Sequence, residues 1–134
     1  MSVHSALRAD PCAIVLAAVL EEVRATASEA QARGFLLAVG RRLAAAFPLT
    51  GIVELDALEE GMATILQRLG AGTVRLMVDA DGIGIEHAAG APEGIAPDIL
   101  EGLYAGWFAT LGNDRLALTR RASAPGRLSF HYGR

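Results

Sequence analysis

The chain has 134 residues, a length that suits a single domain able to bury about two-thirds of the surface of its unfolded state. Hydrophobic residues make up 52% of it, which is high for a small monomer and favours an oligomer that hides further apolar surface. The net charge of −3 provides no basic face for nucleic acid, and a single cysteine, Cys12, excludes an intramolecular disulfide framework.

The start of the chain predicts a mobile arm followed by a helix. Residues 1–9 show no periodic pattern, so we expect them to form the arm. Asp10 is a favourable N-cap and Pro11 suits the first helical position, and apolar residues then recur at helical spacing to about Ala25. Cys12 lies in this apolar run and is expected to be a small core residue rather than a catalytic thiol.

Two more helices are predicted before the first strand. One begins at Ser28 and ends at Pro48, because proline cannot continue a helix. The other covers residues 52–69, where apolar side chains recur at alternating spacings of three and four, as in a packed seam. Gly70 ends this helix.

The apolar period then changes to two, which indicates β-structure. Residues 73–78 alternate between polar and apolar side chains and predict a half-buried strand. Residues 79–82 read Asp-Ala-Asp-Gly and predict a turn, and residues 83–87 predict the returning strand of a hairpin.

The last elements are a helix and a second hairpin. The helix covers residues 97–111, and the strands of the hairpin cover residues 116–120 and 128–132. Three helices, a hairpin, a helix and a hairpin predict the α+β class, with an antiparallel sheet packed on helices. Residues 10–134 are expected to form a single domain.

The helix over residues 97–111 carries an unusual surface. Gly102 and Gly106 lie on one helix face, since they are four residues apart, and they open a strip that has no Cβ atoms. Leu103 and Trp107 form a bulky ridge beside that strip. Each glycine destabilises a helix by about 1 kcal/mol relative to alanine, so we expect a compensating close approach by another backbone.

The usual metal-binding patterns do not predict a metal site in this sequence. Asp79 and Asp81 resemble the start of a calcium loop, but the residue at its twelfth position is Gly90 rather than a glutamate, so a hairpin turn is the better interpretation. The three histidines, His4, His87 and His131, do not show helical ligand spacing. We therefore expect no metal and no cofactor, and place the last two histidines on strands.

A few residues suit carbohydrate chemistry without defining a site. Glu86 and Glu101 are a conceivable carboxylate pair for sugar hydrolysis, although Glu101 is better explained as an anion that stabilises a helix N-terminus. His4 and Tyr104 offer a polar contact and a stacking ring. The residues by themselves indicate an oligomerising domain without a recognisable active site.

The sequence does not contain an apolar run of the ~20 residues that a membrane span needs. The apolar stretch over residues 12–20 is similar to the core of a signal peptide. However, Asp10 and Pro11 precede it, Glu21 and Glu22 follow it, and the helical pattern then continues. We therefore do not expect a cleaved signal.

Residues 96–107 read Ala-Pro-x-x-Leu-Glu-Gly-Leu-Tyr-x-x-Trp, which resembles the signature helix of the D subunit of bacterial cellulose synthase. The order of elements agrees with that family over nearly the whole chain. Shorter stretches also resemble it: residues 39–42, residues 72–76, and Ile85 with His87. One departure is Ala71, where the family has a bulky aromatic residue.

The resemblance implies a non-catalytic accessory subunit of cellulose biosynthesis. The family forms a ring-like octamer, a tetramer of dimers, whose passages guide nascent β-1,4-glucan chains made by the catalytic synthase. In that picture the N-terminal arms line the passages, which implies glucan contact for Ser2, Val3, His4 and Ser5. Gly102, Leu103, Gly106 and Trp107 would pack within or between subunits. We expect a place on the cytoplasmic side of the membrane synthase complex, with the periplasm as the alternative.

Two other functions stay open from the residues alone. A small-ligand sensor or adaptor domain is the main alternative, and a pocket lined by Tyr104 and Phe108 would favour it. A glycan-active enzyme that uses Glu86 or Glu101 is the other.

Overall fold

The computed structural model describes residues 11–49, 54–88, 96–111, 116–124 and 126–134. The chain divides into two compact units, residues 1–35 and residues 36–134. Each unit is described by itself below.

The first unit contains α2 (Pro11–Thr26) and the first turns of α3 (Glu29–Ala46). A capping box starts α3. The Gln31 backbone N–H donates to the Ser28 hydroxyl at 3.1 Å, and the Ser28 N–H donates to the Gln31 side-chain oxygen at 3.0 Å. These reciprocal bonds satisfy two backbone donors that the helix leaves unpaired. The predicted start at Ser28 is therefore confirmed, and α3 ends two residues before Pro48.

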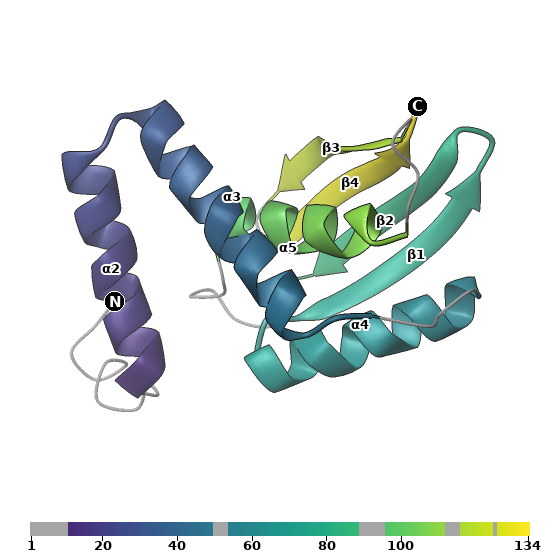
Figure 1. The fold of residues 1–134 in the computed structure, drawn as a ribbon, viewed down its shortest axis with the longest axis horizontal. Coiled ribbons are helices and arrows are strands. Elements are labelled where there is room, and N and C mark those ends of the chain that lie inside the picture. Colours follow the sequence, from purple (N-terminus) through teal and green to yellow (C-terminus); the bar gives the residue numbers. More distant parts are fainter. Residues whose placement is uncertain (1–10, 50–53, 89–95, 112–115, 125) are drawn as a thin grey trace. The chain divides into compact units, whose positions relative to one another are not determined.

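The second unit is built on a four-stranded antiparallel sheet (Figure 1). Both predicted hairpins form, the first from β1 (Thr73–Asp79) and β2 (Gly82–Ala88), the second from β3 (Ala117–Ala124) and β4 (Arg127–Gly133). The strand order is β1-β2-β4-β3, so the hairpins join through β2 and β4. The α+β class with an antiparallel sheet is confirmed.

One face of this sheet is covered by helices. α4 (Leu55–Leu69) packs against β1, and α5 (Pro97–Ala109) packs against β3 and β4 (Figure 1). Because side chains alternate along a strand, Val74 and Leu76 on β1 are buried while Thr73 and Arg75 are exposed. The buried face continues across the sheet through Ile85, Phe130 and Tyr132. We call the opposite side, which carries Thr73 and Arg75, the open face.

The core between helices and sheet is rich in aromatic rings from α5. Tyr104, Trp107 and Phe108 are each at most 1% exposed. The Phe108 ring stacks on Tyr132 of β4 with centroids 4.6 Å apart, and the Tyr104 ring tilts against Phe130 at 5.4 Å. α5 is thereby fixed to the second hairpin by ring contacts, which stabilise beyond the area they bury.

The other side of α5 meets the second half of α3 at backbone contact. A Cβ on Gly40 would lie 2.1 Å from the Ile99 carbonyl oxygen, and one on Gly102 would lie 2.1 Å from the Leu37 carbonyl oxygen. One turn along, a Cβ on Gly106 would lie 2.6 Å from a neighbouring Cβ. The close approach expected from the glycine strip is thus made by a helix of the same chain.

We expect Gly40→Ala to lower the free energy of unfolding by about 3 kcal/mol, because the added methyl group meets rigid backbone rather than a side chain that can move. Gly34→Ala on the same helix is the matched control. Gly34 is exposed and a Cβ there meets no described atom within 4 Å, so higher helix propensity should raise stability by up to about 1 kcal/mol. Urea unfolding measures both, and equal effects would contradict the contact.

Candidate functional site

The four residues predicted to contact glucan, Ser2, Val3, His4 and Ser5, lie outside the described residues. The four predicted packing residues are buried by, or in close contact with, other parts of the same chain. Gly102 and Gly106 face α3 as described above, and Leu103 and Trp107 are 0% and 1% exposed. The Trp107 indole N–H donates to the Phe47 carbonyl at 2.9 Å, which holds the segment just past the end of α3.

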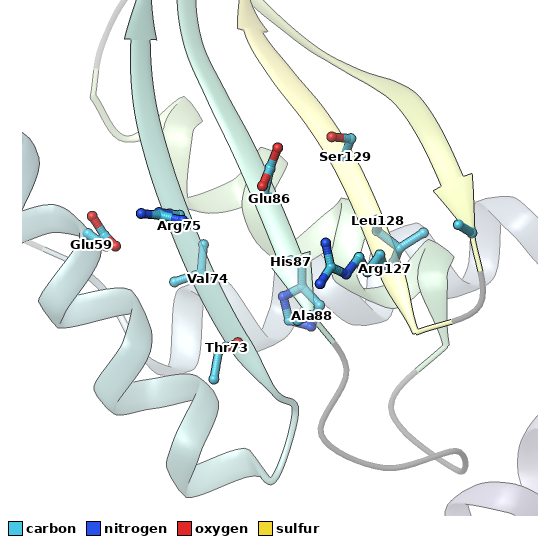
Figure 2. Close-up of a pocket in the computed structure, with 11 residues that line it drawn as sticks. Glu59, Thr73, Val74, Arg75, Glu86, His87, Ala88, Arg127, Leu128 and Ser129 are labelled. Atoms are coloured by element: carbon cyan, nitrogen blue, oxygen red, sulfur yellow. The ribbon is translucent and has the colours of Figure 1, made fainter.

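The sheet carries a pocket of about 450 Å³ at the end where β1 begins and β2 ends (Figure 2). Two registered rows of the open face cross it. Arg75, Glu86 and Ser129 form one row from β1 through β2 to β4. Thr73, Ala88, Arg127 and Ala124 form the next, from β1 to β3. Glu59 of α4 adds a further carboxylate to the lining.

His87 lies at the base of this region and is tied into the core. Its side chain alternates to the helix-covered face and is 2% exposed. The His87 Nε2 atom lies 2.7 Å from the Ala71 carbonyl oxygen, and Nδ1 lies 2.6 Å from the Tyr104 hydroxyl. A carbonyl only accepts, so Nε2 carries the proton; in the neutral ring Nδ1 then accepts from the Tyr104 hydroxyl.

The Ala71 carbonyl is held in place by the end of α4. The Gly70 N–H donates to the Gln67 carbonyl and the Ala71 N–H donates to the Leu66 carbonyl, which is the pair of bonds in a Schellman motif. Gly70 takes the left-handed conformation that this motif needs, with φ of 64°. The imidazole of His87 therefore links α4, β2 and α5 through two hydrogen bonds.

Burial sets the protonation of this pair. It lowers the pKa of the His87 imidazole and raises the pKa of the Tyr104 phenol, because both charged forms lose hydration. At neutral pH both groups are neutral. Tyr104 is 0% exposed, so the expected role as a stacking ring for carbohydrate is wrong; its ring is used by the core.

Glu101 does not act as the helix-end anion that the sequence suggested. Asp98 occupies the first turn of α5, and Glu101 accepts a hydrogen bond from Arg120 Nε at 3.0 Å. A second nitrogen of the same guanidinium donates to Asp98. Arg120 thus joins β3 to α5 on the helix-covered face. Glu86 lies on the open face, so the structure does not bring the two glutamates together as a hydrolytic pair.

The Asp-Ala-Asp-Gly segment forms the predicted hairpin turn. An Asp79 carboxylate oxygen accepts from the Asp81 N–H at 2.8 Å, and the carboxylate also lies 2.9 Å from His131 Nε2. The hydrogen bond with His131 is the main cause that lowers the pKa of Asp79. His87 and His131 do lie on strands, β2 and β4. Among the described residues, three or more ligating side chains do not gather into a metal-binding group.

A helix long and apolar enough to span a membrane is not found within the described ranges.

The fold and these contacts define a small α+β protein in which His87, Glu101 and Arg120 bond within the fold and the open face of the sheet carries a pocket. The sequence model of the family of cellulose synthase D subunits matches residues 9–133, nearly the whole chain. The chain belongs to this family, which supports a role in cellulose biosynthesis. Comparison with curated proteins found no match.

We expect the His87 pair to make stability depend on pH. Above about pH 6.5 the imidazole is neutral in both the folded and the unfolded chain, so it adds no pH dependence to the free energy of unfolding. Below it the unfolded chain takes up the proton first, because the folded pKa is lowered, so the free energy of unfolding falls until the folded pKa is passed.

The measurement is urea unfolding at several pH values. His87→Gln should flatten the slope below pH ~6.5. A slope unchanged by His87→Gln would contradict the buried neutral imidazole.

We expect Arg120→Met to lower the free energy of unfolding by about 2 kcal/mol, because the Glu101 carboxylate loses the hydrogen bond from the Arg120 guanidinium. The Glu101 side chain is only 10% exposed, so water replaces that donor poorly. Arg121→Met is the control, since Arg121 is exposed and follows Arg120 at a register shift in β3. Equal losses in thermal or urea unfolding would show that the Arg120 bridge is not stabilising.

Proposed function

We propose that this chain is a non-catalytic accessory subunit of cellulose biosynthesis. In this proposal it forms a ring-like oligomer, an octamer built as a tetramer of dimers. The ring guides nascent β-1,4-glucan chains or organises synthase complexes for ordered fibre assembly. The observation that carries the proposal is the family match over residues 9–133.

Assembly is supported by the apolar residues of the first unit. On α2, Ile14 is 40% exposed, Val15 62% and Val19 43%. The described residues of this unit form one helix and the start of another, which is too little structure to bury these side chains by itself. Contact with other copies of the chain would remove them from water.

The proposal assigns glucan contact to the N-terminal arm, through Ser2, Val3, His4 and Ser5. It places the assembly with the membrane synthase complex on the cytoplasmic side, and the periplasm is the alternative. A non-catalytic role fits the separation of Glu86 and Glu101 on opposite faces of the sheet.

A small-ligand sensor or adaptor is the second candidate. The observation that would favour it is a pocket lined by Tyr104 and Phe108. The pocket on the open face is lined by neither, and both rings are 0% exposed. A ligand that copurifies with the chain would still favour this candidate.

We expect light scattering coupled to size exclusion to give an oligomer at micromolar concentration, and Val15→Asp to reduce its mass. Ala17→Asp is the matched control, because residues two apart lie about 200° apart around a helix. The same charge is then placed on the opposite side of α2. A stable monomer in the unmodified protein would overturn the ring.

The role in biosynthesis is tested in cells. A strain that lacks the chain should make cellulose of reduced fibre order, which X-ray diffraction or electron microscopy of the product measures. Fibres of normal order in that strain would overturn the role in cellulose assembly.

A further inference from the structure

We propose that the pocket on the open face binds a neutral, hydroxyl-rich glycan segment, as a site separate from the N-terminal arm. The pocket has a volume of about 450 Å³, within the usual range for small-ligand sites. Its shape and its charges both point to this class of ligand.

The hollow follows from two alanines in the row that runs from Thr73 on β1 to Ala124 on β3. Ala88 on β2 lies between Thr73 and Arg127, and Ala124 lies beyond Arg127 on β3. Arg127 stands between the two alanines, and Arg75 and Glu86 lie in the neighbouring row, so alanine forms the floor of the pocket and these longer polar side chains form its walls. A sugar ring has the same division, with C–H groups on its faces and hydroxyls around its edge.

The charges of the lining balance. Arg75 and Arg127 supply two cations, and Glu59 and Glu86 supply two anions. Such a site does not favour an anion or a cation by net charge. It does suit hydroxyl groups, which both donate and accept, since guanidinium only donates and carboxylate only accepts.

The polar groups of the walls are available for a ligand. Within the part of the chain that the structure describes, we find no hydrogen bond to the side chains of Arg75, Glu86 or Arg127. They also form no ion pair there within 4 Å. Figure 2 shows the guanidinium of Arg75 and the carboxylate of Glu59 turned toward one another beside the pocket. Ser129 adds a hydroxyl next to Glu86 on the neighbouring strand.

The glycan class rests on the pocket alone, and the choice of a β-1,4-glucan as its natural source rests on the proposed function. We therefore test cellopentaose and maltopentaose as neutral chains with different linkages. Pentamers of glucuronic acid and of glucosamine serve as an anionic and a cationic chain. Saturation-transfer difference NMR on the full chain follows the ligand signals and works for an assembly of any size.

At least one of the two neutral chains should give a saturable saturation-transfer signal that is stronger than the signals of the charged chains. Ala88→Leu fills the floor and should weaken binding by about tenfold or more. Ala117→Leu is the matched control, because Ala117 is exposed on β3 outside the pocket. If Ala88→Leu fails to fold, Glu86→Gln at an exposed position should instead shift preference toward the anionic chain.

Three results would overturn the pocket proposal: no saturable binding, tighter binding of a charged chain to the unmodified protein, or binding unaffected by Ala88→Leu and Glu86→Gln. Stronger binding of cellopentaose than of maltopentaose supports the link to cellulose, and equal binding supports the neutral-glycan site without that link. If the pocket proposal fails, the oligomer and fibre-order measurements still test the proposed function. Failure of the pocket is therefore distinguishable from failure of the proposed function.

Discussion

The structure depends on the backbone contact between α3 and α5. Ordinary side chains keep packed helices 8–10 Å apart, but Gly40 and Gly102 remove the Cβ atoms that would separate these two. α5 then has room for α3 on one side and for the sheet on the other, so its aromatic residues can fill the core. The helix penalty of the glycines is offset by this three-layer packing, and the Trp107 bond to Phe47 holds the same crossing at its far end.

Most of the fold could be predicted from the sequence because its signals are local. A change of apolar period from helical spacing to two marks the first hairpin, and Pro48 and Gly70 mark helix ends. The glycine strip predicted a close backbone approach as well. It did not identify the partner, because Gly40 looks like one more glycine in a helix until the crossing brings it to Gly102.

The contacts that the sequence could not predict join distant segments. His87 meets Ala71 and Tyr104 across separations of 16 and 17 residues, and its partners depend on where α4 ends and how α5 sits. The sequence predicted that Glu101 stabilises the N-terminus of its helix because it lies near the start of that helix. Its partner Arg120 lies on a strand that only the fold brings close. The pocket was missed for the same reason, since its rows require β2 and β4, from different hairpins, to pair.

The two faces of the sheet differ in the aromatic residues that they carry. Tyr104, Trp107 and Tyr132, the rings that most often stack on sugars, are all buried on the helix-covered face. A glycan on the open face would therefore be held by hydrogen bonds that Arg75 donates and Glu86 accepts, which exchange readily with water. Binding of that kind is weak and short-lived. For a protein proposed to guide a growing chain, weak contact is an advantage, because a tightly held glucan would stop moving.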